Sequence, residues 1–485
     1  MTDFSKLNIT SALLGLKNKD FKSVELTEYF INQIDKKDSL NCFITKTFDK
    51  AVDMAKRSDE KITKNQELGL LEGIPIGMKD LFCTKDIRTT AGSKILNSFI
   101  PFYESTVSKN LWDSGAVLLG KTNMDEFAMG SANTTSFFGN VINPLKSKNN
   151  DKDLVPGGSS GGSASSVAAG LCLAATGSDT GGSIRQPASF CGLVGLKPTY
   201  GRCSRFGMVA FASSLDQAGP ISLTVEDSAR MLQSMVSYDS KDSTSSKKKI
   251  ENFLNYKKYD LKGKKIGVPK EYLLDGLNAE IKKAWDLGIS WFKSVGSEIV
   301  EVSLPNTDSA LPTYYIIAPA EASANLARYD GIRYGFRAEE KSDLTQLYEE
   351  TRAQGFGKEV KRRLMIGTYV LSAGYYDAYY LKALKVRKLI SDDFSKAFKK
   401  CDLILTPTTP NVAFPIGEKQ TDPIEMYLND VLTVPASLAG LPAISVSASL
   451  NSDSLPRGLQ SNGKLFEKSS ILSAGSVIED SRDFL

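Results

Sequence analysis

A stretch rich in glycine and serine, from Gly157 to Ser183, places the strongest constraint on how this chain can fold. Gly-Gly-Ser elements at both ends of this stretch flank a run of small and apolar residues. A flexible linker or a phosphate-binding nest would also be rich in glycine. The linker is disfavoured because Val167, Leu171 and Leu173 continue the stretch as a buried helix pattern. We therefore expect a tightly packed segment in the interior of the protein.

The chain contains no histidine among its 485 residues. A Ser-His-Asp triad, a Cys-His dyad and a His-ligated metal site are therefore excluded. A general base at neutral pH must be a carboxylate or a deprotonated lysine, tyrosine or cysteine. The six cysteines form no C-x-x-C pair, so we expect buried thiols and no metal site.

The charge balance and the N-terminus indicate a cytoplasmic protein without a membrane partner. Sixty Lys and Arg residues against 56 Asp and Glu residues leave a net charge of +4. This charge is too small to indicate a nucleic-acid or membrane surface by itself. The first residues lack a basic, apolar leader, and no apolar run is long enough to span a bilayer.

Apolar periodicity divides the chain into five parts. Near-helical spacing at the start predicts a helical layer, and short apolar runs that alternate with helical patterns from Leu71 onward predict α/β architecture. A strand at Lys265–Val268, a helix ending at Gly296 and a strand over 299–304 predict a β-α-β unit. The expected parts are an N-terminal helical layer (1–65), a core with the candidate catalytic residues (66–236), an exposed polar connection (237–265), a second α/β part that completes the same sheet and the substrate pocket (266–450), and a C-terminal end (451–485).

The segment Gly115–Thr122 matches the P-loop pattern G-x-x-x-x-G-K-[ST] letter for letter. A P-loop must follow a strand and open a helix, but here the variable positions 116–119 are themselves a buried strand pattern. The preceding segment 106–114 has a helical pattern, and no apolar helix pattern follows. We therefore expect no ATP site in this chain.

Two longer motifs make the chain resemble the amidase signature family. They are GGSSGG at 157–162 and GSDTGGSIRQP at 177–187, and the likeness continues through GLKPT at 195–199 and covers most of the chain. The resemblance implies the α/β amidase signature fold, in which helices flank both faces of a large mixed β-sheet. Within the family, the likeness is strongest to the glutamine-hydrolysing subunits of tRNA-dependent amidotransferases.

By this resemblance, Lys79, Ser159 and Ser183 form a catalytic triad. Lys79 ends the apolar run 73–78, so a strand would place its backbone, and burial there favours the neutral amine. Neutral Lys79 would take a proton from Ser159, whose hydroxyl can both donate and accept, and Ser159 would take one from the nucleophile Ser183. The resemblance also implies a cis peptide bond before Ser159. The implied oxyanion hole consists of the backbone N–H groups of Thr180, Gly181, Gly182 and Ser183.

Glutamine carries an α-amine and an α-carboxylate, so a selective pocket should offer a carboxylate and a guanidinium. The resemblance points to Asp430 and to the pair Arg362 and Arg363. If positions 360, 364, 367 and 371 form the buried stripe of a helix, Arg363 lies about 70° from its centre and Arg362 points nearly opposite. We therefore favour Arg363. Tyr314 and Ser131 are further pocket candidates by the same resemblance, whereas a solvated Arg362 and a helix-end Asp430 are the structural alternatives.

The resemblance implies that the chain hydrolyses glutamine and supplies ammonia to a larger complex. A partner with kinase activity would bind the tRNA, Mg²⁺ and ATP and convert Glu-tRNA(Gln) to Gln-tRNA(Gln), so this chain needs no cofactor. Action on Asp-tRNA(Asn) is left open. A small third subunit would brace the interface, and the nearly neutral charge agrees with tRNA contacts made mainly by the partner.

Two other functions are compatible with the same residues. A stand-alone amidase would use the triad on another small amide. A non-enzymatic scaffold would carry a vestigial triad, but the intact residues Lys79, Ser159 and Ser183 argue against it.

The C-terminal end departs from the family pattern. Where relatives usually carry an apolar pair after Gly458-Leu459-Gln460, this chain continues Ser461-Asn462-Gly463-Lys464. Asn and Ser suit turns better than a buried ladder, so the pairing of the last strand is in doubt.

Overall fold

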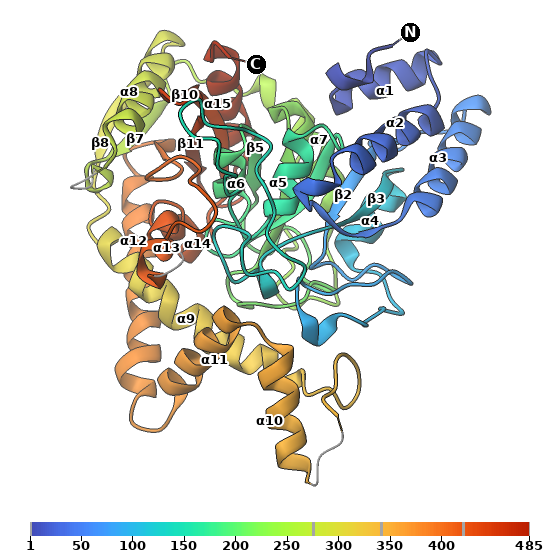
Figure 1. The fold of residues 1–485 in the computed structure, drawn as a ribbon. Coiled ribbons are helices and arrows are strands. Elements are labelled where there is room, and N and C mark those ends of the chain that lie inside the picture. Colours follow the sequence, from blue (N-terminus) through green and yellow to red (C-terminus); the bar gives the residue numbers. More distant parts are fainter. Residues whose placement is uncertain (1, 274–276, 340–342, 420–421, 485) are drawn as a thin grey trace.

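One mixed β-sheet of eleven strands runs through the computed structural model, which describes residues 2–273, 277–339, 343–419 and 422–484 (Figure 1). The strand order is β1-β3-β2-β4-β6-β5-β10-β11-β9-β7-β8. The strands are β1 (Phe43–Lys46), β2 (Pro75–Lys79), β3 (Val117–Thr122), β4 (Ala174–Asp179), β5 (Val194–Lys197), β6 (Gln217–Ser222), β7 (Lys265–Pro269), β8 (Glu298–Val302), β9 (Leu403–Pro407), β10 (Ala443–Leu450) and β11 (Pro456–Gly463).

Helices cover the sheet and extend below it as a helical projection (Figure 1). The α-helices are α1 (Ile9–Asn18), α2 (Ser23–Lys36), α3 (Phe48–Thr63), α4 (Thr106–Asp113), α5 (Gly161–Ala168), α6 (Arg185–Phe190), α7 (Val225–Met235), α8 (Ala279–Ser294), α9 (Ala310–Asn325), α10 (Leu344–Gly355), α11 (Lys358–Leu371), α12 (Lys382–Ala397), α13 (Pro423–Tyr427), α14 (Val434–Leu438) and α15 (Lys468–Ser481). A short π-helical segment, η9 (Tyr376–Leu381), leads into α12.

Helices pack against both faces of the sheet. A Cβ atom on Gly195 of β5 would meet Ala188 of α6, whereas Gly475 of α15 lies against Ile444 and Val446 of β10. Gly195 is opposite Ser445 in the β5–β10 ladder, and neighbouring side chains of a strand point to opposite faces. The predicted mixed sheet with helices on both faces is therefore confirmed.

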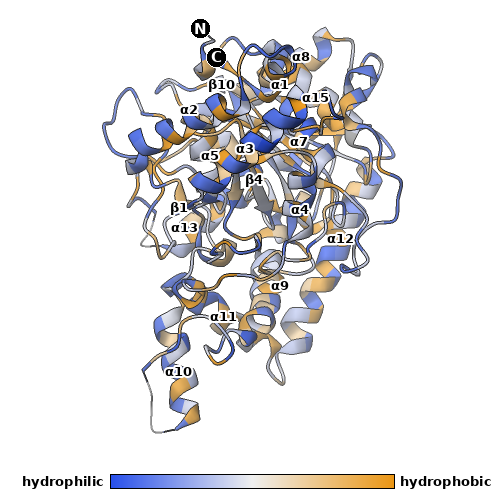
Figure 2. Cartoon of the chain, turned by 90° about the vertical axis from the view of Figure 1, so that its right-hand side faces the viewer, coloured by the Kyte–Doolittle hydropathy of each residue, from blue (hydrophilic) through white to orange (hydrophobic). Residues whose placement is uncertain are grey.

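The N-terminal region contains the helices α1, α2 and α3, and α3 turns its hydrophilic residues outward (Figure 2). Ala51, Ala55 and Ile62 of α3 are buried at helical spacing. The predicted helical layer (1–65) did not include β1, which pairs antiparallel with β3 at the edge of the sheet. Among the described residues, no helix is both long enough and apolar enough to cross a bilayer.

Two predictions for the middle of the chain, the β-α-β unit and the strand in the P-loop-like segment, are confirmed. β7, α8 and β8 form the expected β-α-β unit, with β7 and β8 in parallel register. The segment that matches the P-loop pattern is the buried strand β3, preceded by α4. Lys121 Nζ donates to the carbonyl of Phe82 at 2.8 Å and forms a buried ion pair with Asp80, so it contributes to no phosphate loop.

Three sequence predictions need correction. The small-residue helix α5 is shorter than expected, because Gly170 has a φ of +67° and the chain then enters β4. The segment 237–265 is less exposed than its composition predicts, since Asp242 pairs with Arg205 and Phe253 lies in the core. The strand after Gly458 is also fully paired, because β11 runs between β10 and β9 as far as Gly463.

Candidate active site

Lys79 is the last residue of β2, and β3 pairs with this strand in parallel. Its backbone N–H donates to Thr176 Oγ1 of β4 at 2.9 Å. The side chain is fully buried, and its Nζ atom lies 2.8 Å from the hydroxyl oxygens of Ser159, Ser160 and Ser178. The amine is thus enclosed by three neutral hydroxyl groups.

Burial lowers the pKa of Lys79 to about 7, although the carboxylates of Asp125, Asp179 and Asp216 act in the opposite direction. The cause is the loss of hydration of an ammonium ion in the protein interior. The hydroxyls around Nζ carry no charge that could compensate for this loss. Burial therefore favours the neutral amine of Lys79 near neutral pH.

The segment before α5 brings Ser159 to this amine. The Gly158–Ser159 peptide bond is cis. Gly158 donates its N–H to Gln186 Oε1 at 2.9 Å, and Gln186 Nε2 donates to the carbonyl of Ser131 at 2.7 Å. A Cβ atom on residue 158 would lie 2.1 Å from Asp125 Oδ2, so only glycine fits here. Gln186 therefore ties this segment to the helix that follows Ser183.

Ser183 lies in the turn between β4 and α6, and a buried ion pair fixes that turn. Arg185 Nε and Nη2 each lie 3.0 Å from the carboxylate of Asp179. The same guanidinium donates to the carbonyl of Thr433 at 3.0 Å and to Gln460 Oε1 at 2.9 Å. Burial alone would raise the pKa of Asp179, but the charge of Arg185 holds it below its usual value. The turn is thus held from both of its ends.

The turn presents unused hydrogen-bonding groups. Within the described part of the chain, Ser183 Oγ makes no hydrogen bond, including none to Ser159, and its residue is 8% exposed. In the same part of the chain, the backbone N–H groups of residues 180–183 also have no acceptor. Thr180 is held through its side chain, which donates to Asp216 at 2.7 Å. The four N–H groups are thus free to bind an anion.

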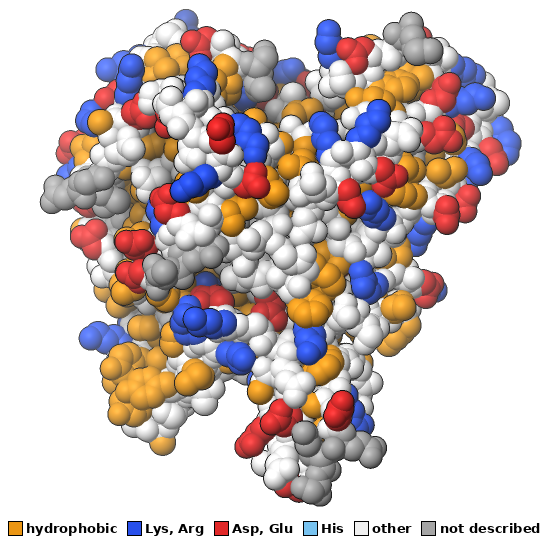
Figure 3. Space-filling model, viewed as in Figure 1, with side chains coloured by type: hydrophobic (Ala, Val, Ile, Leu, Met, Phe, Trp, Pro, Cys, Tyr) orange, Lys and Arg blue, Asp and Glu red, His pale blue; other side chains and the backbone are white. Residues whose placement is uncertain are grey.

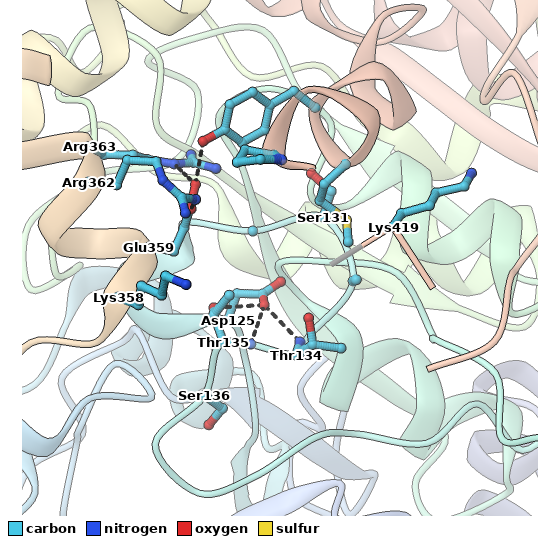
Figure 4. Close-up of a pocket in the computed structure, with 15 residues that line it drawn as sticks. Asp125, Ser131, Thr134, Thr135, Ser136, Lys358, Glu359, Arg362, Arg363 and Lys419 are labelled. Carbon is cyan, nitrogen blue, oxygen red and sulfur yellow. Dashed lines mark hydrogen bonds and ion pairs between the residues drawn. The ribbon is translucent and has the colours of Figure 1, made fainter. Parts of the chain in front are cut away.

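A cavity of about 420 Å³ lies between the segment 125–136, the first turns of α11 and the segment 419–427 (Figure 4). Arg363 and Ser131 line it, whereas the triad, Asp430 and Tyr314 do not. The lining residues are Asp125, Gly130, Ser131, Ala132, Thr134, Thr135, Ser136, Lys358, Glu359, Arg362, Arg363, Lys419, Pro423, Met426 and Tyr427.

Arg363 projects from α11 into the interior, whereas Arg362 stays half-exposed. Arg363 Nε donates to Glu359 Oε1 at 2.8 Å, and the same oxygen accepts from Tyr427 Oη at 2.7 Å. The ring of Tyr315 lies 5.2 Å from the guanidinium carbon. No hydrogen bond from Nη1 or Nη2 of Arg363 is formed within the described residues. The helical spacing thus identified correctly which of the two arginines is buried.

Asp430 and Ser131 are joined although 299 positions separate them in sequence. Ser131 Oγ donates to Asp430 Oδ2 at 2.5 Å. Burial raises the pKa of Asp430 to about 7, although the bond from Ser131 and the charge of Arg363 act to lower it. Tyr314 packs against the catalytic turn, since a Cβ on Gly181 would lie 2.9 Å from its Cζ. These three residues therefore connect the cavity to the turn.

Several contributing residues were not singled out from the sequence. Ser160 and Ser178 lie inside the two quoted motifs, but only the fold shows that both contact Lys79. Asp125 accepts hydrogen bonds from the backbone N–H groups of Asn133, Thr134 and Thr135. No local sequence pattern predicts these bonds. Among the described residues, no cluster of three or more Cys, Asp or Glu side chains is placed to hold a metal ion.

The chain is similar to known proteins along nearly its whole length. The family model described as Amidase matches residues 25–472. The A subunit of the glutamyl-tRNA(Gln) amidotransferase of Hyphomonas neptunium is 60% identical over 485 residues, covering 100% of this chain and 99% of the relative. The protein of the same name from Pelagibacter ubique is 58% identical over 484 residues, covering 100% and 98%.

Solved structures with the same fold include an amidotransferase subunit and a peptide amidase. The crystal structure of the glutamyl-tRNA(Gln) amidotransferase A subunit from Thermotoga maritima matches with a TM-score of 0.82 and 38% identity, covering 100% of this chain and 96% of that one. The native peptide amidase from Stenotrophomonas maltophilia matches with a TM-score of 0.83 and 27% identity, covering 98% and 97%.

Proposed function

The chain belongs to the amidase family, and we propose that it is the glutamine-hydrolysing subunit of a tRNA-dependent amidotransferase. The observation that carries this proposal is the buried amine of Lys79 in contact with Ser159, next to a turn that offers Ser183. Full-length relatives named as the A subunits of glutamyl-tRNA(Gln) amidotransferases support it over a stand-alone amidase.

Hydrogen-bond counting supports Ser159 as the proton relay. A neutral amine has two N–H donors and one lone pair, but three hydroxyls surround Lys79 Nζ. Ser160 Oγ donates to the carbonyl of Ser178 at 3.3 Å, so it must accept from Lys79. If Ser178 accepts the second N–H, the lone pair faces the hydroxyl of Ser159. Ser159 then donates to Lys79 and is able to accept a proton from Ser183.

In the proposed reaction, Ser183 Oγ attacks the carboxamide carbon of glutamine. Its proton passes to Ser159 as the proton of Ser159 passes to Lys79. The N–H groups of residues 180–183 stabilise the tetrahedral oxyanion. The C–N bond then breaks, and Lys79 returns the proton through Ser159 to the leaving ammonia. Water hydrolyses the γ-glutamyl ester on Ser183 by the same relay, releasing glutamate.

We assign the α-carboxylate of glutamine to the cavity and its α-ammonium group to Asp430, which Ser131 links to the cavity wall. The unused Nη1 and Nη2 atoms of Arg363 match an α-carboxylate, which favours bidentate pairing. Ionised Asp430, held by Ser131, would bind the α-ammonium group. Tyr314, packed on Gly181, would border the space between that group and the reacting amide.

Released ammonia would pass to a partner subunit that binds the tRNA, Mg²⁺ and ATP, and a small third subunit would complete a heterotrimer. The product would be Gln-tRNA(Gln), with Asn-tRNA(Asn) as a second candidate. Co-purified complex should release ammonia from glutamine, and Ser183→Ala in that complex should abolish this release. High turnover of simple amides by the isolated chain, with no response to the partner, would favour a stand-alone amidase instead.

The pH dependence of glutamine hydrolysis follows from the lowered pKa of Lys79. The neutral amine is the active form, so kcat should rise with pH through about 7. Between pH 6 and pH 8 the neutral fraction grows about tenfold for a group of this pKa. Steady-state kcat at saturating glutamine measures this rise. Under these conditions the bound α-ammonium group keeps Asp430 ionised throughout, so the change in kcat reports on Lys79. A kcat that falls or stays flat across this range would contradict a lysine base.

Ser178→Ala should lower kcat about fivefold, because it removes one acceptor that orients Lys79, and one hydrogen bond contributes about 1 kcal/mol. The side chain of Ser108 is the matched control, since it is also fully buried but bonds to Ser105, the N-cap residue of α4. Stopped-assay ammonia release by both alanine variants is the measurement. Equal losses in both would show that the effect is general destabilisation.

A further inference from the structure

The carboxylate of Glu359 lies at the wall of the cavity and accepts hydrogen bonds through both of its oxygens (Figure 4). Oε1 accepts from Arg363 Nε at 2.8 Å and from Tyr427 Oη at 2.7 Å, and Oε2 accepts from Arg362. The side chain of Glu359 is 12% exposed. Because three donors of the protein already use this carboxylate, we assign it no direct bond to glutamine. Any role in substrate recognition must act through a neighbour.

The bond from Glu359 determines how the guanidinium of Arg363 is oriented. The guanidinium is planar and its N–H bonds have fixed directions, so one bond at Nε limits where Nη1 and Nη2 can point. The rings of Phe211, Tyr315 and Tyr427 lie 5.7, 5.2 and 5.3 Å from the guanidinium carbon and restrict it further. An arginine that is held in place before the ligand arrives loses less conformational entropy on binding.

Tyr427 holds Glu359 from a second segment of the chain. It is the last residue of α13, whereas Glu359 and Arg363 belong to the first turns of α11. The ring of Tyr427 stacks on that of Tyr315 from α9, with centroids 3.9 Å apart and an angle of 23° between the planes. The stacked ring fixes the position of the hydroxyl that donates to Glu359. The carboxylate is therefore held between two helices that are distant in sequence.

A purely structural role is the alternative, because Glu359 and Arg363 are four residues apart on one helix. Charged side chains of both signs are scattered over the face shown in Figure 3, and exposed pairs of this spacing contribute little to stability. Lys388 and Asp392 form such a pair on α12, with side chains that are 72% and 37% exposed. The pair of Glu359 and Arg363 differs, because its arginine is 3% exposed and a further donor, Tyr427, comes from another helix.

We propose that Glu359 is a positioning residue for glutamine, which orients the Arg363 guanidinium to receive the α-carboxylate and is itself held in place by Tyr427. This inference rests on the proposed function, because it takes glutamine as the substrate and Arg363 as the group that binds its α-carboxylate. It adds a determinant of substrate selectivity that contacts none of the reacting groups.

The test compares three variants of the full chain in its co-purified complex. Glu359→Gln keeps the shape of the side chain but loses the negative charge and one of the two acceptor atoms. Tyr427→Phe keeps the stacked ring and loses only the hydroxyl that donates to Glu359. Asp392→Asn is the matched control, since it removes the same charge from a pair of the same spacing on α12. Initial rates over a range of glutamine concentrations give kcat and KM, and thermal melting checks that each variant is folded.

Glu359→Gln should raise KM for glutamine about 30-fold and change kcat less than about threefold, the size of effect expected from loss of a hydrogen bond to a charged group. Tyr427→Phe should raise KM about fivefold, as loss of one ordinary hydrogen bond does. Asp392→Asn should leave both parameters unchanged. An unchanged KM for glutamine in folded Glu359→Gln would overturn the proposal.

A substrate without the α-carboxylate gives a second readout. 4-Aminobutanamide is glutamine without this group, so wild type and Glu359→Gln should hydrolyse it at the same rate. If Glu359→Gln lost as much activity with 4-aminobutanamide as with glutamine, the effect would be a general disturbance of the site, which contradicts the proposal.

A double variant shows whether Glu359 acts through Arg363. Once Arg363→Met has removed the guanidinium, adding Glu359→Gln should raise KM by less than about twofold more, because the effects of residues in contact are not additive. If the two increases in KM multiplied, Glu359 would act by another route and the proposal would be wrong.

The complex carrying Ser183→Ala separates this inference from the proposed function. If that complex still released ammonia from glutamine at the wild-type rate, the assigned glutaminase site would be wrong and the inference would fall with it. If Ser183→Ala is inactive while Glu359→Gln keeps the wild-type KM, the proposed function stands and only the role of Glu359 is wrong.

Discussion

Replacing Lys79 by methionine is expected to lower kcat for glutamine hydrolysis by about 10⁴-fold, the upper range for loss of a general base that activates a nucleophile. Methionine keeps most of the volume of the side chain but has no lone pair to receive the proton of Ser159. In the described part of the chain, the groups that contact the Nζ atom of Lys79 are the hydroxyls of Ser159, Ser160 and Ser178, and none of them is basic at neutral pH. Ammonia release at saturating glutamine measures the loss.

Lys197 provides the matched control for this substitution. Burial also lowers the pKa of Lys197 to about 7, but its Nζ donates to the carbonyl of Leu441 and contacts no serine of the site. Lys197→Met should therefore retain kcat within about tenfold, because Lys197 acts on the turn through the charge of Asp179 and not on the reacting hydroxyls. If both methionine variants lost activity equally while remaining folded, buried lysines would matter for packing and Lys79 would not be the base.

Replacing Arg363 by methionine is expected to lower kcat/KM for glutamine by about 10³-fold, because loss of a buried charged partner costs about 2 to 5 kcal/mol. Most of the change should fall on KM, since the α-carboxylate lies away from the reacting amide. Initial rates over a range of glutamine concentrations separate the two parameters. A small amide without an α-carboxylate should react equally slowly with wild type and variant.

The neighbouring residue provides a control on the same helix. Arg362 also pairs with Glu359, but its side chain is 36% exposed, against 3% for Arg363. Arg362→Met should change kcat/KM less than about threefold, as is usual for a surface charge. If Arg362→Met reproduced the full loss and Arg363→Met did not, the helical phase argument would have selected the wrong arginine.

Local sequence patterns were sufficient where one element determines the position of a residue. The apolar run before Lys79 indicated a strand, and that strand holds the lysine in the interior. The helical spacing of Val360 and Leu364 indicated that Arg363 faces inward. In both cases the period of a single strand or helix decides which side chains are buried.

Sequence patterns were insufficient where the partners are distant or the backbone turns. The contact between Ser131 and Asp430 joins segments that no local period relates. Three hydroxyls converge on Lys79 only because β2, β4 and the segment before α5 meet in space. Ser461 and Asn462 suit turns, yet both lie within β11 because strands on either side supply the ladder. Tertiary pairing overrides residue preference at such positions.

The most direct test of a relay from Ser183 through Ser159 to Lys79 is to locate the acyl group formed from glutamine. Wild-type chain mixed with glutamine and quenched in acid can be digested, and mass spectrometry can then identify the modified serine. We expect a γ-glutamyl ester on Ser183 in the wild type and none in Lys79→Met. An ester on Ser159, Ser160 or Ser178, or undiminished labelling of Ser183 in Lys79→Met, would contradict the relay.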